Sequence, residues 1–367
     1  MNNSTHRYFD FLRYCIDDKS PIPVSIHDID WYDLFAFMRQ QTLTGIGYLG
    51  VARMKQEGVV IPRKIFLRWY ALSEKIRARN IRVNKCCVEL AEKLKNEGFC
   101  SCILKGQGNS IMYPDPYVRT SGDIDVFVMQ NEDASIKERR KTILEWVKKR
   151  FPQTKMRYQH IDFPIFKDVA VEMHFIPTAK NNPIYKCRIQ QWAERLMFQQ
   201  CHNFVCLPDN VGTVATPTSD FNIIYQLSHL MHHFFDEGIG LRQMMDYYFL
   251  LKNYNGNRDR ITADLKHLGM YKFAGAVMYV MQEVFGLEKE RMLVPLDAKR
   301  GKTLMEEILK GGNFGKYSGL TNHSTGTKYF LKIRRNLRFV HEYPAEALCE
   351  PVFRTWHFFW RQWHKFV

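Results

Sequence analysis

The sequence lacks any long apolar run. No stretch approaches the roughly 18–20 uninterrupted apolar residues that a membrane-spanning helix needs. The opening residues, MNNSTHR, lack the basic patch and apolar segment that mark a secretory signal. Internal repeats and low-complexity linkers are also missing. We therefore expect a globular protein of the cytoplasm with no transmembrane segment.

Paired cysteine motifs are absent too. The nine cysteines are an odd number, and no pair of CxxC motifs occurs among them. This pattern indicates neither a zinc ribbon nor a disulfide framework. We expect buried, reduced thiols, which agrees with a cytoplasmic location.

Acidic side chains are fewer than basic ones. The 53 Lys and Arg residues and 38 Asp and Glu residues leave a net charge of +15. Such a chain attracts anions, which include nucleic acids, nucleotides, phosphorylated substrates and membrane surfaces. Hydrophobic residues make up 46% of the 367 residues, which is enough for a substantial core and excludes a disordered chain.

The hydrophobic pattern divides the chain into three segments and predicts an α+β fold. Residues 1–97 are expected to be helical, 98–208 to form a small mixed β-sheet core, and 209–367 to form a C-terminal helical domain. The clearest helix begins at Pro62 and ends near Gly98, a residue suited to a left-handed cap.

Shorter patterns predict the remaining elements. The expected strands cover 99–104, 123–128, 156–160, 169–175 and 203–207. Helices are expected between them at 133–149 and 185–200. Helices after Thr216 are expected to about Phe235 and then at 240–253, 258–285, 301–311, 327–341 and 346–366.

The segment Gly122–Val128 (GDIDVFV) carries the strongest chemical signal. In a strand, residues two apart point to the same side, so Asp123 and Asp125 project together. Two adjacent carboxylates repel each other unless a cation lies between them, and oxygen ligands suit Mg²⁺. The alternative is that both are turn and edge residues without a function.

Two further segments support a functional interpretation. In the strand VEMHF, Glu172 and His174 share one face. Three converging carboxylates are what a two-metal phosphoryl- or nucleotidyl-transfer site requires. The turn Lys105–Ser110 (KGQGNS) contains glycines, which allow backbone N–H groups to approach a phosphate closely.

The Lys-Gly turn, the Gly-Asp-x-Asp strand and the Glu-bearing strand together resemble the DNA-polymerase-β-like nucleotidyltransferase superfamily. The closer resemblance is to a bacterial branch of it, described as an uncharacterised nucleotidyltransferase family. The likeness covers about residues 98–250. It includes Tyr113-Pro114 and Arg119 and, more weakly, His229–His233 and Gly240–Asp246.

This resemblance implies a reaction and a set of residues. Asp123 and Asp125 would hold two Mg²⁺ ions, and Glu172 would complete the acceptor-side metal site and orient or deprotonate the attacking group. A nucleoside triphosphate, expected to be ATP, would transfer its nucleoside monophosphate to an acceptor and release pyrophosphate. The acceptor is open: a small molecule, a sugar phosphate, RNA or a protein. The implied nucleotide-binding residues are Lys105, Gly106, Gln107, Gly108, Ser110, Arg119 and His174.

Two of these residues keep a second interpretation. Arg119 can meet a phosphate bidentately, or it can pair with a nearby carboxylate such as Asp115. His174 can contact the substrate, or it can make a structural hydrogen bond.

Three histidines and an ion pair follow in the C-terminal segment. His229, His232 and His233 lie near one helical face, where we expect them to line the nucleotide cleft. Binding of a transition metal is the alternative for this cluster. Arg242 and Asp246 are one turn apart and predict a salt bridge, with acceptor recognition as the second option.

The C-terminal stretch 351–367 is both aromatic and basic. Its aromatic side chains fall mainly on one helical face, so we expect it to dock on the protein's own core. Peripheral contact with an anionic membrane is the alternative. A second basic run comprises Lys332, Arg334, Arg335 and Arg338. We expect it to form a solvated helix face; contact with an acidic acceptor or nucleic acid is the alternative.

Two other functions remain open at this point. One is a metal-dependent phosphohydrolase that uses the His229–His233 cluster. The other is a non-catalytic protein that binds polyanions through its charge of +15. The carboxylate pattern favours the nucleotidyltransferase.

Overall fold

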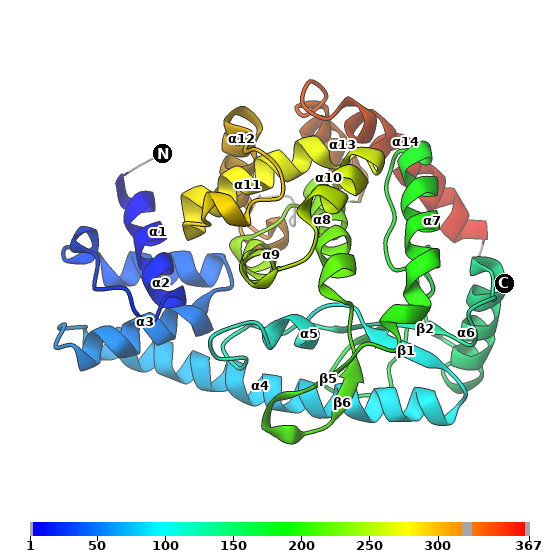
Figure 1. The fold of residues 1–367 in the computed structure, drawn as a ribbon, viewed down its shortest axis with the longest axis horizontal. Helices are drawn as coiled ribbons and strands as arrows, with labels where there is room; N and C mark the ends of the chain where they lie inside the picture. The colour runs from blue at the N-terminus through cyan, green and yellow to red at the C-terminus, as the bar shows by residue number, and fades with distance from the viewer. Residues whose placement is uncertain (1–2, 318–324, 364–367) are drawn as a thin grey trace.

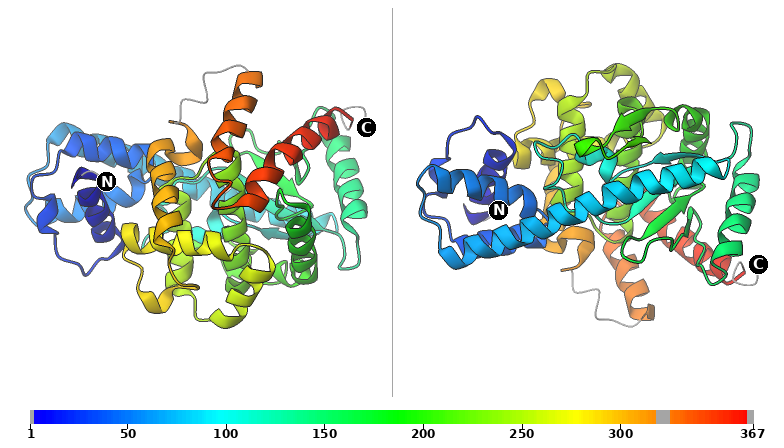
Figure 2. Two further views of the ribbon diagram at one scale, coloured as in Figure 1. Left: turned by 90° about the horizontal axis from the view of Figure 1, so that it is seen from above. Right: turned by 90° about the horizontal axis from the view of Figure 1, so that it is seen from below.

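A computed structural model describes residues 3–317 and 325–363, which fold into helices around a small sheet (Figures 1 and 2). The predicted α+β class is confirmed, because a mixed sheet lies between N-terminal and C-terminal helices. None of the helices in these two ranges combines the length and the apolarity needed to cross a membrane.

The elements follow the expected order along the chain. The N-terminal helices are α1 (Asn3–Ile16), α2 (Trp31–Gln40), α3 (Thr44–Gln56) and α4 (Arg63–Asn96). The strands are β1 (Cys100–Ile103), β2 (Ile124–Met129), β3 (His160–Asp162), β4 (Val171–His174), β5 (Phe204–Cys206) and β6 (Thr213–Ala215). The helices between them are α5 (Gln107–Ser110), α6 (Ile136–Arg150) and α7 (Pro183–Gln200). The later helices are α8 (Ser219–Asp236), α9 (Leu241–Asn253), α10 (Arg258–His267), α11 (Tyr271–Phe285), α12 (Ala298–Gly311), α13 (Thr325–Leu337) and α14 (Pro344–Trp363).

Helix α4 runs beneath the sheet and reaches the N-terminal helices at its other end (Figure 2). The predicted helix is confirmed: Pro62 precedes its first turn, and Gly98 follows its end with a left-handed φ of +81°. Its first half buries Trp69 among the N-terminal helices, whereas its second half buries Leu90 and Leu94 against the sheet. Helix α4 therefore connects two hydrophobic cores.

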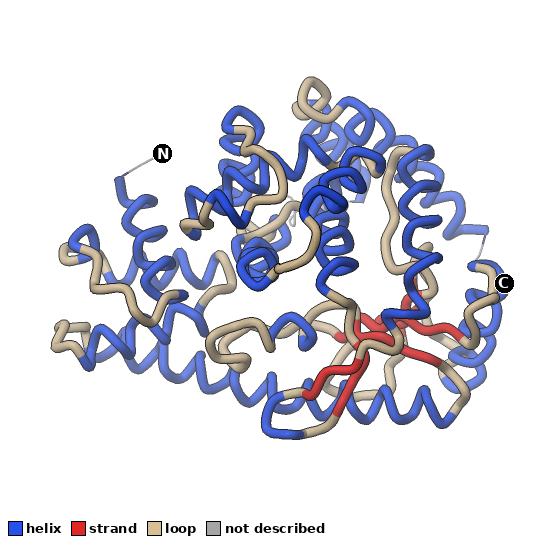
Figure 3. Tube along the Cα trace, viewed as in Figure 1, coloured by secondary structure: helices blue, strands red, loops and turns tan. Residues whose placement is uncertain are grey.

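The main sheet has four strands in the order β1-β2-β4-β3. Figure 3 shows the strands in red among the surrounding helices. Strand β2 is antiparallel to β1 and parallel to β4, and β3 is antiparallel to β4. Ile124, Val126 and Val128 pack into the core that contains the second half of α4. Phe127 and Met129 belong to the larger core formed with the other helices. Strand β2 is therefore buried on both faces.

The predicted elements differ from the structure at three places. The expected helix over 258–285 is two helices, because Gly269 between α10 and α11 has a left-handed φ of +69°. The expected strand over 156–160 is shifted: β3 begins at His160, and Met156 makes only an isolated bridge to Ile161. Strand β6, which pairs with β5, was not predicted, since three residues are too few to show a period.

The division into segments 1–97, 98–208 and 209–367 remains a prediction. The larger hydrophobic core includes residues of both the first and the last of these segments, from α1 through α14. The smaller core lies between α4, α6 and the sheet. The N-terminal and C-terminal helices thus share apolar contacts across the central segment.

The C-terminal helix α14 docks on the α/β part, as expected. Rings of Phe353, Trp356 and Trp360 lie around Tyr158, with centroids 6.0, 5.4 and 5.8 Å away. On the same helix, Phe359 is 65% exposed. Contact of this helix with a membrane remains a prediction. The last four residues of the predicted stretch, 364–367, lie outside the described residues.

The basic run of α13 is engaged largely in ion pairs. Lys332 pairs with Asp236 at 3.1 Å, and Arg335 pairs with Glu307 at 3.0 Å. Arg338 reaches the same glutamate at 2.9 Å. These contacts join α13 to α8 and α12, so the run is more than a solvated face.

We expect Gly45→Ala to destabilise the protein, because helix α3 passes very close to another segment at this residue. A Cβ added at Gly45 would lie 2.1 Å from the carbonyl oxygen of Val118, so backbone atoms would have to move. Such overpacking typically lowers the free energy of unfolding by about 1–3 kcal/mol. Urea denaturation of the variant and the wild type measures this loss. The control is Gly311→Ala in α12, where a Cβ meets open space, and we expect no loss of stability there. Equal stability of the two variants would contradict the close approach.

Candidate active site

The sheet presents a row of acidic side chains on one face. The strand register pairs Asp125 of β2 with Glu172 of the parallel β4, and Glu172 with Asp162 of β3. Asp123 lies two residues before Asp125 and points to the same side. The predicted convergence is confirmed: one carboxylate oxygen each of Asp123, Asp125 and Glu172 lies within 4.8 Å of the others.

A cavity of about 500 Å³ lies over these carboxylates. The sheet supplies one wall, and helices α8 and α14 supply others. From α8 come His229, His232 and His233, which line the cavity as expected. From α14 come Phe353 and Arg354. The cavity is therefore closed partly by helices far from the sheet in the sequence.

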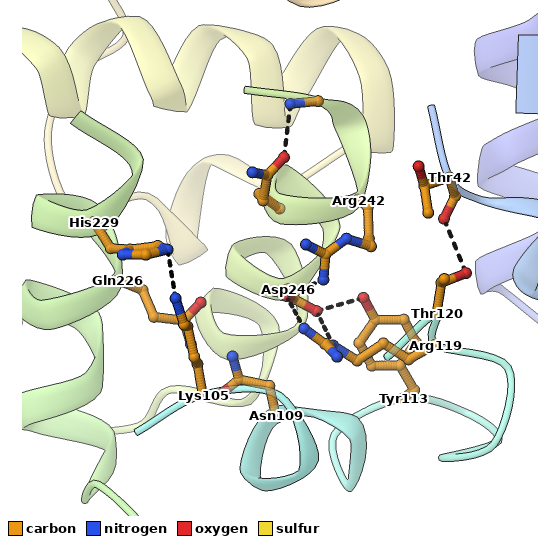
Figure 4. A network of polar contacts seen from close by, with 12 residues as sticks. Thr42, Lys105, Asn109, Tyr113, Arg119, Thr120, Gln226, His229, Arg242 and Asp246 are labelled. Carbon is orange, nitrogen blue, oxygen red and sulfur yellow. Dashed lines mark hydrogen bonds and ion pairs between the residues drawn. The ribbon is translucent and has the colours of Figure 1, made fainter. Parts of the chain in front are cut away.

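Lys105 provides a cation directly beside the acidic row. Its Nζ lies 3.1 Å from Asp125 Oδ2 and 3.0 Å from His229 Nε2 (Figure 4). Burial by itself raises the pKa of Asp125, but the Lys105 ammonium and a hydrogen bond from His174 outweigh it and hold this pKa well below its usual range. Asp125 is therefore ionised.

His174 is the second positive group of the site. Its Nε2 lies 3.0 Å from Asp125 Oδ1 and 3.6 Å from Glu172 Oε2. Burial opposes its charge, but hydrogen bonds to these two carboxylates raise its pKa to about 9. For Asp123 the neighbouring charge of Asp125, together with burial, raises the pKa. The site has more negative charge than its own side chains balance, which favours a bound cation.

In the turn Lys105–Ser110, one side chain lines the cavity and others pack inside the protein. Gly106 has a left-handed φ of +69° and precedes α5. Gln107 is buried and bonds to Asn84, and Ser110 is buried with its Oγ donating to Gln107 O at 2.9 Å. Gly108 packs against another segment: a Cβ there would lie 2.9 Å from Thr216 Cγ2. The side chains of Gln107 and Ser110 hold the turn in place, and Lys105 faces the cavity.

Arg119 is used inside the protein. Its Nε and Nη2 donate to the two oxygens of Asp246 at 2.7 and 2.8 Å, and Tyr113 donates to the same carboxylate at 2.7 Å (Figure 4). Of the two interpretations of Arg119, the structure therefore shows the carboxylate pair, with Asp246 in place of Asp115. The predicted Arg242–Asp246 pair is present at 3.9 Å.

Among the described residues, two groups are placed to hold a metal ion. One is the predicted set of Asp123, Asp125 and Glu172, and the other consists of His160, Glu172 and His174. Neither includes the three histidines of α8. Burial is the main cause that lowers the pKa of His229, His232 and His233, so these side chains are neutral.

Several cavity residues were missed by the sequence analysis. His160 had a usable signal, because His160-Ile161-Asp162 alternates polar and apolar residues as β4 does. Asp236 and Arg354, which form an ion pair at 2.6 Å, had none, since they are 118 residues apart and meet only through α14.

The described residues form an α+β fold with a cluster of three carboxylates that could hold a metal ion. Over residues 27–286 the chain matches a family model described as "Uncharacterised nucleotidyltransferase", and it belongs to that family. No curated protein matches the chain, and no solved structure does. The match extends beyond the expected 98–250 at both ends, so α2, α3, α4, α10 and α11 belong to the family's common part.

We expect Arg119→Ala to lower the free energy of unfolding by about 3–5 kcal/mol, because it leaves the buried Asp246 carboxylate without its partner. Chemical denaturation with fluorescence detection measures this loss. The control is Arg82→Ala, which removes an exposed pair with Asp168 and is expected to leave the free energy of unfolding almost unchanged. A fully stable Arg119→Ala variant would show that this pair does not hold the fold.

The same pair predicts a pH dependence. Burial raises the pKa of Asp246, but Arg119 outweighs it, so the net pKa is lowered from its usual value near 3.8. A lowered folded-state pKa contributes stability above the unfolded pKa, and this contribution disappears as the pH falls through the folded pKa. We therefore expect the stability difference between the wild type and Asp246→Asn to narrow below about pH 4. Urea titrations at several pH values test this, and a constant difference would contradict it.

Proposed function

We propose that this protein is a Mg²⁺-dependent nucleotidyltransferase of the DNA-polymerase-β-like superfamily. It moves a nucleoside monophosphate from a nucleoside triphosphate, expected to be ATP, to an acceptor hydroxyl or phosphate and releases pyrophosphate. The observation that carries this proposal is the convergence of Asp123, Asp125 and Glu172 on one face of the sheet. Membership of a nucleotidyltransferase family supports the reaction class.

The residues present fit a magnesium site. All three donors are carboxylate oxygens, which are the ligands that Mg²⁺ prefers. Asp125 Oδ2 is buried, and within the described chain its neighbour is the Lys105 ammonium at 3.1 Å, without a hydrogen bond of good geometry. Asp123, Asp125 and Glu172 would hold Mg²⁺, which would neutralise phosphate charge and make a hydroxyl a better nucleophile.

The protein's own side chains have distinct tasks in this proposal. Glu172 accepts the proton of the attacking hydroxyl or orients it. His174 holds Asp125 in position with a hydrogen bond and Glu172 with an ion-pair contact at 3.6 Å. The ammonium group of Lys105 pairs with Asp125 and can instead pair with a phosphate oxygen of the substrate. His229 accepts from Lys105 and keeps that ammonium at the cavity wall.

The triphosphate is assigned to Lys105 and to the backbone of the Gly106 turn. Gly106 has the left-handed φ of +69° that lets such a turn approach a phosphate. Gln107, Gly108 and Ser110 then support the turn, because their side chains or Cα atoms pack inside the protein. Arg119 acts through the pair with Asp246, which ties the segment before β2 to α9.

The alternative functions gain no specific support. A phosphohydrolase centred on His229–His233 would need these side chains to converge on a metal, and the metal-capable groups of the described residues lie on the sheet. Polyanion binding through the charge of +15, cytoplasmic location and the bacterial origin of the family branch remain predictions. The acceptor and the base preference are left open by the proposal.

We expect Asp125→Asn to abolish nucleotidyl transfer. Loss of several kcal/mol of charge stabilisation corresponds to about three orders of magnitude or more in rate. The assay measures pyrophosphate released from each of the four nucleoside triphosphates with Mg²⁺ and a small-molecule extract, followed by mass spectrometry of the nucleotide adduct.

Two further variants make this test decisive. Asp123→Asn changes an exposed member of the same cluster. We expect this variant to fold normally, so its loss of activity cannot be attributed to misfolding. Asp168→Asn removes an exposed carboxylate outside the cavity, and it is expected to keep full activity. Transfer at the wild-type rate in Asp125→Asn or Asp123→Asn would overturn the proposed function.

A further inference from the structure

We propose that His160, Glu172 and His174 form a binding site for a first-row divalent transition-metal ion. This site lies beside the three carboxylates and shares Glu172 with them. It rests on the proposed function only through that shared ligand, because two of its three donors are nitrogen atoms that a magnesium site does not use.

The strand register brings the three side chains together. His160 of β3 is the cross-strand partner of His174 of β4. Glu172 lies two residues before His174 on β4, so it projects from the same face of the sheet. The rings of the two histidines have centroids 5.0 Å apart and both line the cavity. Their proximity thus follows from backbone pairing and does not depend on a mobile loop.

The spacing of the donor atoms suits one small ion. His160 Nδ1 lies 3.4 Å from Glu172 Oε2, and His174 Nε2 lies 3.6 Å from the same oxygen. Nitrogen and oxygen ligands at about 2.0–2.1 Å from a metal, at near-tetrahedral angles, lie about 3.3–3.4 Å from each other. The observed separations therefore require only small adjustments. Asp125 Oδ1, 3.0 Å from His174 Nε2, is close enough to become a further ligand.

The outward-facing ring nitrogens provide a second, independent observation. His174 Nδ1 faces the carbonyl oxygen of Ile176 at 3.4 Å, and His160 Nε2 faces Asp162 Oδ1 at 4.0 Å. Histidines that ligate metals usually donate their other N–H to a carbonyl or a carboxylate, which fixes the ring and the tautomer. His174 has such a partner on the side away from Glu172, whereas the buried Nε2 of His160 has Asp162 nearby but makes no hydrogen bond among the described residues. Nε2 of His174 and Nδ1 of His160 are the nitrogens nearest Glu172. In the absence of an ion, Nε2 of His174 carries a proton toward Asp125, so binding of the metal at this nitrogen would release that proton.

The donor set selects a class of metal. Imidazole nitrogen suits zinc, iron, copper, nickel and related ions, whereas Mg²⁺ takes oxygen ligands. Two histidines and one carboxylate therefore favour an ion such as Zn²⁺ or Fe²⁺ at this position, and Mn²⁺ serves as the paramagnetic probe for it. Glu172 belongs to both groups: it lies near the carboxylates of Asp123 and Asp125 and near the imidazoles of His160 and His174.

The test uses Mn²⁺ alone, without nucleotide. Pulsed electron paramagnetic resonance of the full-length protein with Mn²⁺ should show coupling to ¹⁴N from imidazole. His160→Gln should weaken Mn²⁺ binding, followed by titration calorimetry, by about tenfold or more and reduce the nitrogen coupling. His160 is the ligand of choice for substitution, because its side chain is 14% exposed and lies on the edge strand of the sheet.

His202→Gln is the matched control. His202 is an exposed histidine that bonds to the carbonyl of Phe198, away from the cavity, and its substitution should leave Mn²⁺ binding and the nitrogen coupling unchanged. Absence of ¹⁴N coupling in the wild-type protein would overturn the inference. So would coupling and affinity that are both unchanged in His160→Gln.

The outcome is separable from that of the proposed function. Nitrogen-coupled Mn²⁺ in a protein that transfers no nucleotide supports this site and counts against the transferase. Transfer that is lost in Asp123→Asn, in a protein whose bound Mn²⁺ shows no nitrogen coupling, supports the transferase and overturns the histidine site.

Discussion

The active-site face depends on one electrostatic constraint: three carboxylates are held close together by backbone pairing. The parallel register of β2 and β4 places Asp125 beside Glu172, and the alternation of β2 adds Asp123. Their mutual repulsion is offset by two cations, Lys105 and His174, which contact Asp125 directly. Carboxylates this close together would also be stabilised by a bound metal ion, which is the basis of the proposed function.

The rest of the fold keeps this face in place and covers it. Helix α4 carries the sheet on one of its halves and the N-terminal helices on the other, so both cores are connected by one rigid element. The buried ion pair between Arg119 and Asp246 ties the segment before β2 to α9. On the open side, α8 and α14 close the cavity, and the Arg354–Asp236 pair joins these two helices.

Family membership and the geometry of the carboxylates both support the proposed nucleotidyl transfer. The family match covers the sheet, α4 and the helices up to α11, whereas α12, α13 and α14 lie outside it. Helix α14 nevertheless contributes Phe353 and Arg354 to the cavity, so part of the site is built from outside the common region. If the proposed function holds, acceptor selectivity is expected to reside here, because the three carboxylates proposed as catalytic come from the common part.

Much of the site was readable from the sequence, because its key residues follow local rules. The two-residue period of a strand determined that Asp123 and Asp125 share a face, and that Glu172 and His174 do. The cap glycine and the apolar period likewise predicted α4. Three features were decided only by tertiary structure: which strand lies beside which, the partner of Arg119 and the residues of α14 in the cavity. The physical reason is that strand order and long-range ion pairs depend on how distant segments pack, and no local periodicity encodes a contact between residues 119 and 246.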